Sequence, residues 1–256
     1  MNNHLGLLYM NADRVFYLGL LGSPHERVLG ALTLYASRSG ELELLVDDVV
    51  TQRGELLIVP PYLAHRIRAE DKQIFCLLIE PEYLDQSRLP AQLQPHGPHQ
   101  AQTAVVARMR QAAQQLATPP RQPLSNQAFD LLLLGVELPS RTLQPRLDAV
   151  LELLRGEPTA SLSAADCAAR CQLSPSRFMH LFSATVGSSF RHLRTWKRAR
   201  NLLPLVQSPQ SLTDIALELG YADASYFSNS IRQITGLRPK DIIAGSKRLK
   251  LLHGTQ

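Results

Sequence analysis

Two short stretches in the C-terminal half of the chain carry side chains that could contact the bases of DNA. In each stretch, three side chains are spaced so that they would lie on one face of a helix. They are Ser176, Met179 and His180 in the first stretch and Ser225, Ser228 and Asn229 in the second. His180 and Asn229 could form hydrogen bonds with purine edges, and Met179 suits contact with a thymine methyl group. A helix that enters the major groove, about 12 Å wide, presents its N-terminal side chains in this way. The pattern therefore favours two helices that read base sequence.

Both stretches belong to an internal repeat. One copy runs from Leu162 to Phe182 and the other from Leu212 to Ile231, each with a glycine beyond its end. The recurring positions, which are 49 residues apart, are Phe178 and Phe227, Phe182 and Ile231, and Gly187 and Gly236. Each copy predicts two helices joined by a tight turn.

Small and capping residues predict how each pair of helices is held. Ala168 and Ala216 would let the two helices of a copy cross closely, and Gly220 can adopt the left-handed conformation of a sharp turn. Ser174-Pro175 is typical of a helix start, and Asp223 stands at the matching cap position of the second copy. The large apolar residues of each second helix then face the core and leave the six polar or sulfur-containing side chains exposed.

The charge of the chain is distributed unevenly. From Pro145 onward there are 15 Lys and Arg against 8 Asp and Glu, whereas residues 1–144 hold 12 against 14. No acidic residue lies between Asp166 and Asp214, an interval that contains Arg170, Arg177, Arg191, Arg194, Lys197, Arg198 and Arg200. A phosphate backbone favours such a surface because each neutralised phosphate releases counterions. The phosphate contacts are predicted at Arg177, Arg191, Arg232 and Arg238, although a solvated basic face without a ligand would have the same composition.

Length and composition limit the class of protein. A chain of 256 residues, 45% of them hydrophobic and 19% charged, predicts two domains with cores of their own. The sequence contains no run of about 18 apolar residues, so no membrane span is predicted. Met1 to Met10 lack the features of a signal peptide. Three cysteines are too few for a disulfide scaffold, so a reducing, cytoplasmic location fits best.

Residues 5–85 predict strands. Short apolar runs, separated by turn residues such as Ser39-Gly40, recur at roughly ten-residue spacing, which favours a small antiparallel sandwich or barrel. The runs are Leu29–Tyr35, Leu42–Val46, Glu55–Val59 and Ile74–Ile79.

Beyond a linker at Pro90–Pro98 the apolar period changes to that of helices. One helical face would hold Val105, Met109, Ala112 and Leu116. A second helix, with Phe129 and Leu131–Leu134, is apolar nearly all round and must be buried, for which homodimerisation is a good candidate. Pro139–Pro145 would be the linker to a helical domain that opens with Leu147, Val150, Leu151 and Leu154.

Residues 145–243 resemble the AraC/XylS family of transcription regulators. The resemblance rests on Leu173-Ser-Pro-Ser-Arg-Phe178, on Ser211 to Asn229 and on the closing Gly236-Leu-Arg-Pro239, with Trp196-Lys-Arg198 on a linking helix. It implies a seven-helix domain in which a helix at about 189–206 joins two helix-turn-helix units, and it makes the six exposed residues base readers. The sequence departs from the family pattern at Gln172, Asn229, Ile231 and Ile242-Ile243, and Pro204 falls late in the linking helix.

The N-terminal half is similar to the cupin-like sensor domain of the same regulators. The similar stretches are Leu42–Asp48, Arg53–Pro61, Ala64-His65 and Ile74–Pro81. This resemblance implies a barrel whose interior holds a small-molecule effector, and helices at about 99–138 that dimerise or contact the DNA-binding half. His65 is interpreted either as a histidine satisfied at the rim of the barrel or as a polar contact to the effector. The expected architecture is α+β: an antiparallel cupin-like β-barrel in residues 1–88, a helical segment in 89–142 and an AraC-type domain in 143–256. The expected partners are double-stranded DNA, a second copy of the chain, an effector and RNA polymerase.

Two other functions stay open. The first alternative, suggested by a cupin-like barrel, is a metal-dependent enzyme with a DNA-binding tail. A cupin metal site, however, needs two or three histidines with a carboxylate. Besides His65 the sequence offers only His25 outside a strand and His96 and His99 in a linker, so no metal, cofactor or catalytic residue is predicted. The other alternative is a regulator that no longer senses a ligand, which a barrel interior filled by large side chains would favour.

Cys167 and Cys171 lie four residues apart and could form a redox pair or half of a metal site. They align, however, with Ile215 and Leu219 of the second copy, which predicts that they are buried small hydrophobic residues.

Overall fold

The computed structural model describes residues 6–22, 25–94, 97–118, 120, 122–156 and 162–254, without the side chains of residues 99, 101 and 156. The chain divides into two compact units, which we call the sheet unit and the helical unit. The sheet unit comprises Met1–Ser140 and Lys247–Gln256, and the helical unit comprises Arg141–Ser246. The boundary at Ser140 lies within the linker predicted at Pro139–Pro145. None of the described helices has the length and hydropathy needed to cross a lipid bilayer.

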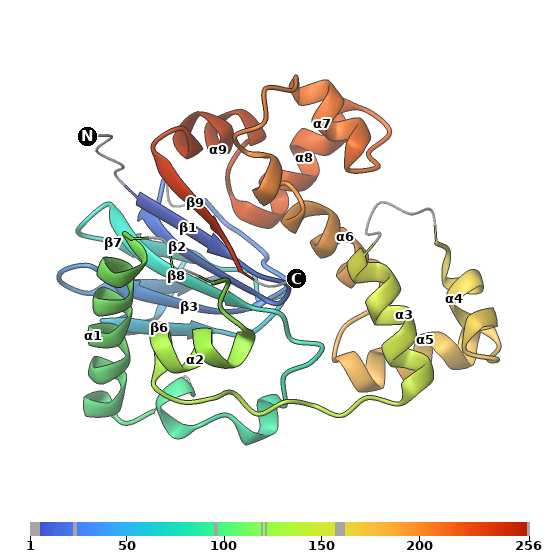
Figure 1. Cartoon of the computed structure of the whole chain (residues 1–256), viewed down its shortest axis with the longest axis horizontal. Coiled ribbons are helices and arrows are strands. Elements are labelled where there is room, and N and C mark those ends of the chain that lie inside the picture. The colour runs from blue at the N-terminus through green and yellow to red at the C-terminus, as the bar shows by residue number, and fades with distance from the viewer. Residues whose placement is uncertain are drawn as a thin grey trace. The chain divides into compact units, whose positions relative to one another are not determined.

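Two separate sheets form the frame of the sheet unit (Figure 1). The larger has the strand order β6-β3-β8-β2-β1-β9 and the smaller the order β5-β4-β7. In chain order the strands are β1 (Gly6–Met10), β2 (Arg14–Leu20), β3 (Leu32–Ser37), β4 (Leu42–Val46), β5 (Val49–Gly54), β6 (Leu56–Val59), β7 (Arg66–Ala69), β8 (Gln73–Ile79) and β9 (Leu249–His253). All neighbouring strands are antiparallel except β1 and β9.

The sheets do not close into the cupin-like barrel that the sequence predicted. Among the described residues no strand ladder joins the six-stranded sheet to the three-stranded one, and only an isolated bridge links Arg27 with His65. A two-residue alternation of apolar side chains requires one buried face, which a barrel and a pair of open sheets both provide. The sequence pattern therefore fits either arrangement, and the strand partners decide between them.

Two helices cover one face of the six-stranded sheet: α1 (His99–Leu116) and α2 (Asn126–Leu134) (Figure 1). The predicted stripe of α1 is buried, with Val105, Met109, Ala112 and Leu116 all at most 2% exposed. The chain forms two short 3-10 helices, η1 (Gln86–Arg88) just before the predicted linker and η2 (Ala91–Leu93) within it.

Helix α2 is only partly buried within the single chain. Phe129 is fully buried and its ring stacks on that of Tyr9, with 4.8 Å between centroids. Leu131, by contrast, is 47% exposed within the single chain. A helix that packs on a sheet buries one stripe only, so an all-apolar surface leaves part of itself uncovered.

The last described strand, β9, belongs to the sheet unit. It pairs in parallel with β1 over five residues, and Gly254 N–H donates to the carbonyl oxygen of Met10 over 2.6 Å. Leu252 is buried in the same core as α1 and α2. From the sequence this segment is expected to belong to the DNA-binding domain, since a five-residue strand after a long helical region carries little periodic signal.

The helical unit consists of seven α-helices and a 3-10 turn among its described residues. They are α3 (Pro145–Gly156), α4 (Ala164–Arg170), α5 (Pro175–Val186), α6 (Phe190–Arg200), η3 (Leu203–Leu205), α7 (Leu212–Glu218), α8 (Ala224–Thr235) and α9 (Pro239–Ser246). The linking helix, expected at about 189–206, ends at Arg200 and is followed by η3. Pro204 accounts for the early end because proline lacks an amide donor and disfavours a helical conformation at the residue before it.

Candidate nucleic-acid interface

Helices α4 and α5 form a pair that is built like the pair α7 and α8. The first helix of each pair begins with the same capping box. Ser163 caps α4, and its own amide N–H donates to the Asp166 carboxylate over 2.8 Å. Ser211 and Asp214 are arranged in the same way at α7, where the distance is 3.3 Å. The sequence analysis missed these caps, although serine followed three residues later by aspartate is their signal.

The turn between the two helices also has the same geometry in both pairs. Leu173 N–H donates to the Ala168 carbonyl oxygen and Tyr221 N–H to that of Ala216, each over 2.9 Å. The residue before each donor is left-handed, with φ of 56° at Gln172 and 73° at Gly220. Gln172 therefore adopts a conformation that costs a non-glycine residue about 1–2 kcal/mol.

The second helix of each pair starts and ends as predicted. The Ser174 hydroxyl accepts from the Arg177 amide over 3.4 Å, and the Asp223 carboxylate accepts from the Tyr226 amide over 2.7 Å. Left-handed glycines end both helices, with φ of 79° at Gly187 and 75° at Gly236. The caps fix where each helix begins, which sets the side chains that its first turns present.

Buried aromatic and aliphatic residues fix the rotation of α5 and α8. The anchoring residues, each at most 1% exposed, are Phe178, Phe182, Phe227 and Ile231. Phe178 and Phe182 also pack on Phe190 at the start of α6, with ring centroids 5.6 and 5.4 Å from it. With these faces turned inward, the opposite faces of α5 and α8 point to solvent.

The six predicted base readers all lie on the accessible side of the two helices. Ser176, His180, Ser225 and Asn229 are exposed, and Met179 and Ser228 are half-buried. The four predicted phosphate contacts, Arg177, Arg191, Arg232 and Arg238, are exposed as well. The arrangement thus keeps short polar side chains free on two capped helices, with cations beside them.

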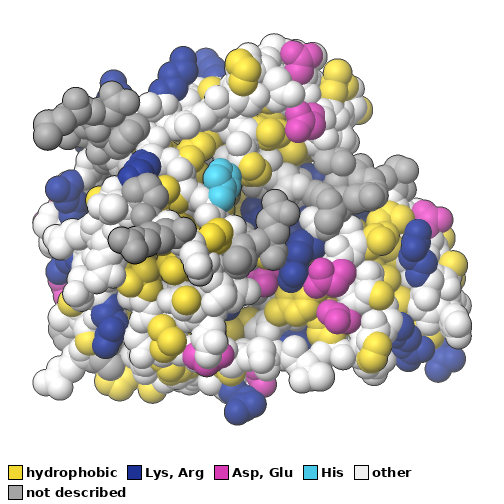
Figure 2. Space-filling model, viewed as in Figure 1, with side chains coloured by type: hydrophobic (Ala, Val, Ile, Leu, Met, Phe, Trp, Pro, Cys, Tyr) yellow, Lys and Arg dark blue, Asp and Glu magenta, His cyan; other side chains and the backbone are white. Residues whose placement is uncertain are grey.

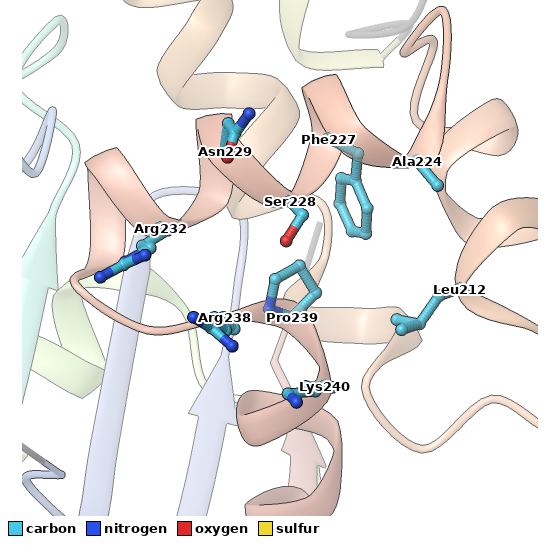
Figure 3. Close-up of a pocket in the computed structure, with 9 residues that line it drawn as sticks. All are labelled: Leu212, Ala224, Phe227, Ser228, Asn229, Arg232, Arg238, Pro239 and Lys240. Atoms are coloured by element: carbon cyan, nitrogen blue, oxygen red, sulfur yellow. The ribbon is translucent and has the colours of Figure 1, made fainter.

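A cleft of about 360 Å³ lies where the end of α8 meets the start of α9 (Figure 3). Arg232 comes from α8, and Arg238 and Lys240 come from the residue before α9 and from its start. Ser228 and Asn229 on α8 also line the cleft. No acidic side chain is among the nine described residues that line it. Three cations without a carboxylate suit an anion such as a backbone phosphate. Lys240 was missed by the sequence analysis, although it directly follows the closing Gly236-Leu-Arg-Pro239.

Not every basic residue in the acid-free interval is available to a ligand. Lys197 is 6% exposed, and the Arg194 guanidinium lies over the Phe190 ring at 5.7 Å. On the face shown in Figure 2, Lys and Arg side chains are spread singly or in small groups among uncharged ones. Net charge alone therefore does not show which basic side chains a ligand could reach, because some of them are buried or packed on other side chains.

Burial explains the cysteines and the tryptophan of the helical unit. Cys167 and Cys171 are at most 1% exposed, and their counterparts Ile215 and Leu219 are at most 2% exposed. The prediction that the two cysteines are buried small hydrophobic residues is therefore confirmed. Burial raises the pKa of both thiols. Trp196 is likewise buried on α6.

His65 lies in the interior of the sheet unit, with both ring nitrogens engaged. Its Nδ1 lies 2.7 Å from the Leu63 carbonyl oxygen and its Nε2 lies 3.0 Å from the Tyr35 hydroxyl. Burial lowers the pKa of His65 to about 4, so the ring is neutral near pH 7. The described residues contain no group of three His, Cys, Asp or Glu placed to hold a metal, while His96 lies outside them and the side chain of His99 is not described.

Comparison with known proteins gives two kinds of similarity. Residues 167–244 match the profile of a helix-turn-helix domain. Over 71 residues the chain is 31% identical to the invasion protein InvF of Salmonella typhi and of Salmonella typhimurium. These 71 residues are 27% of this chain and 33% of the length of those proteins.

Solved structures of ToxT from Vibrio cholerae have a similar fold over most of the chain. The apo form of a ToxT variant superposes with a TM-score of 0.61 at 10% identity, covering 91% of this chain and 97% of that one. ToxT bound to (E)-4-(8-methylnaphthalen-1-yl)but-3-enoic acid gives 0.59 at 11% identity, covering 91% and 98%. At these identities the likeness concerns the fold, an α+β chain with N-terminal sheets and C-terminal helices.

Proposed function

We propose that the protein is a sequence-specific DNA-binding transcription regulator of the AraC/XylS type, because residues 167–244 match a helix-turn-helix domain. The observation that carries the proposal is the duplicated construction of α4–α5 and α7–α8, each with a capped second helix and an exposed polar face. We propose that these pairs are two helix-turn-helix units and that α5 and α8 are their reading helices.

In this proposal the two reading helices enter consecutive major grooves on one side of the duplex, about 34 Å apart. Ser176, Met179 and His180 contact base edges in one groove, and Ser225, Ser228 and Asn229 do so in the other. A short helix held by a buried face can place three side chains in a groove without moving its backbone. Sequence preference then follows from hydrogen bonds and methyl contacts at those positions.

The phosphate backbone is bound beside the reading helices. Arg177 and Arg191 act near α5, while Arg232, Arg238 and Lys240 form the anion-binding cleft near α8. These contacts fix the register of the helices on the duplex and supply most of the salt-dependent affinity.

The sheet unit acts as the sensing and dimerising part of the regulator. A ToxT structure contains an unsaturated fatty acid and another contains an aryl butenoic acid, so a carboxylic acid is the class of effector we propose for this chain. A second copy would cover the exposed part of α2 around Leu131. We further propose RNA polymerase as a partner of the DNA-bound protein and the cytoplasm as its location.

Selection from a pool of random duplexes with the full-length protein tests the proposal. At moderate salt we expect enrichment of related sequences that compete at least 1,000-fold better than random DNA, roughly the lower range of specific binders. Enriched sites should contain two conserved segments separated by about one helical turn. A selected pool that competes no better than the starting pool would contradict sequence-specific binding.

A further inference from the structure

Arg27 is a buried cation in the interior of the sheet unit. It is 6% exposed and is bridged to the segment before β7: Arg27 N–H donates to the His65 carbonyl oxygen over 2.9 Å, and His65 N–H donates back over 3.1 Å. Its side chain contributes a hydrogen bond to the Tyr35 hydroxyl and acts electrostatically on His65 and Cys76. Arg27 therefore lies in the neighbourhood of Tyr35, His65 and Cys76.

None of these neighbours carries a compensating negative charge near pH 7. Burial raises the pKa of Tyr35 and brings that of Cys76 to about 12, so both stay protonated, while burial keeps His65 neutral. Among the ion pairs between described residues none includes Arg27. A buried guanidinium without a counter-ion is costly, so its persistence calls for an anion.

Two donors of Arg27 are unused. Its Nε and Nη2 atoms are buried and have no hydrogen-bond partner. These two atoms form one side of the guanidinium fork, the side that can bind both oxygens of a carboxylate at once.

The same fork is occupied in another buried arginine of this unit. Arg14 is 7% exposed, and its Nε and Nη2 donate to the two carboxylate oxygens of Asp130 over 2.9 and 3.1 Å. Arg14 and Arg27 thus have nearly equal burial and the same pair of donor atoms, but only Arg14 has a carboxylate partner among the described residues. The difference shows what chemical group Arg27 lacks.

We propose that the Nε and Nη2 fork of Arg27 is the binding site for the carboxylate of a small molecule, on the sheet face opposite α1 and α2. Tyr35 stands beside Cys76 and Cys76 beside Tyr17 in one row across β3, β8 and β2, so polar side chains continue along that face. A planar carboxylate matches one guanidinium in shape and charge, whereas a phosphate would bring excess charge to a site with a single cation. That this binding controls DNA binding rests on the regulator function proposed above; the binding itself does not.

Thermal unfolding of the full chain in short straight-chain carboxylates, from acetate to octanoate, tests the site. Sodium chloride at equal ionic strength, the matching amides and sodium phosphate serve as controls. The carboxylates should raise the Tm of the sheet unit, by roughly 5–10 °C at a hundredfold excess over Kd, and the controls should not.

Variants assign the effect to Arg27. Arg27→Met should abolish the rise and should itself leave the ligand-free Tm unchanged or higher, because it removes an uncompensated buried charge. Arg27→Lys keeps the charge without the fork and should weaken the rise. Arg110→Met is the matched control: this arginine is ion-paired with Glu55 over 3.2 Å and the effect should persist without it.

The proposal is overturned if no carboxylate raises the Tm more than chloride does, if phosphate or the amides act equally, or if Arg27→Met responds like the wild type. Binding of the selected duplex is measured on the same preparations. If the wild-type protein does not bind the duplex, the regulator function is contradicted. The carboxylate-binding site at Arg27 is then still judged by the Tm measurements alone.

Discussion

The side chains exposed on α5 and α8 differ in what they can recognise. His180 and Asn229 offer hydrogen-bonding groups, Met179 a half-buried apolar surface and the three serines short hydroxyls. The neighbouring arginines offer charge without base information. At the scale of single residues, function therefore separates into specificity and affinity, and the two respond differently to substitution.

His180→Ala should change preference at one base pair. Loss of its hydrogen bond should cost about 1–3 kcal/mol on the selected duplex and little on a duplex changed at that pair. Titration of wild type and variant against single-base substitutions measures the effect. An equal loss on the selected duplex and on random DNA would remove the assigned role.

Arg191→Ala should weaken binding to every duplex by a similar factor. Because one phosphate contact is lost, the slope of log K against log salt should become shallower by about 1. Arg53→Ala, at an arginine of the sheet unit that is 64% exposed at its side chain, is the control and should leave both affinity and slope unchanged. A selective loss on one sequence would instead make Arg191 a base reader.

His65 should make the sheet unit sensitive to mild acid. Its pKa is about 4 in the folded protein against 6.5 unfolded, so the unfolded chain takes up the proton first as pH falls. The contribution of neutral His65 to the free energy of unfolding is fully present above pH 6.5 and is lost as the pH falls toward 4. The total loss is roughly 3 kcal/mol, at about 1.4 kcal/mol per pKa unit. Urea unfolding followed by circular dichroism at pH 7 and 4.5 should show a smaller difference in His65→Gln, and equal differences would contradict this account.

At the scale of elements, the two helix pairs share caps, turn geometry and terminal glycines but differ in the turn residue. Gly220 adopts its left-handed conformation freely, whereas Gln172 adopts nearly the same conformation with a side chain. The Ala168 and Ala216 carbonyls accept equivalent turn hydrogen bonds, so the backbone geometry is fixed by the pair and not by the residue.

Gln172→Gly should therefore stabilise the helical unit by about 0.5–1 kcal/mol, the strain relieved less the backbone entropy that glycine loses. Gly220→Ala, the matched change, should destabilise it by about 1–2 kcal/mol. The fluorescence of Trp196, the single tryptophan of the chain, reports unfolding of this unit. Destabilisation by Gln172→Gly would mean that the glutamine side chain contributes more than its backbone costs.

At the scale of the whole molecule, the sheet unit encloses the helical unit in sequence. The chain leaves the sheet unit at Ser140 and returns to it at Lys247, where β9 pairs with β1. The sheet unit is therefore complete only after the helical unit has been synthesised. The apolar surface that remains on it is concentrated at a few positions, of which Leu131 on α2 is one.

Leu131→Glu should weaken the proposed homodimer. If a second copy covers α2, a carboxylate at this position must be desolvated in the interface, so the variant should sediment as a monomer at concentrations where the wild type is dimeric. Leu20→Glu, at a leucine of β2 that is 53% exposed, is the control and should not change the assembly. Identical sedimentation of the two variants would place the interface elsewhere.

The sequence by itself determined the helical unit in detail. The repeat, the caps at Ser174 and Asp223 and the apolar anchors of α5 and α8 are local features, set within a few residues of the turns that they shape. For the same reason the sequence located the side chains that face solvent on both helices. Such features need no knowledge of distant partners.

Only the tertiary structure decided what depends on residues far apart in the chain. The open pair of sheets, the return of β9 to β1 and the exposure of Leu131 all follow from which strand or helix is the neighbour, and a period of two or of 3.6 residues does not specify that neighbour. Arg27 is the clearest case. In the sequence it is one arginine among many, and its open fork becomes visible only when Arg14 is found paired with Asp130, 116 residues away.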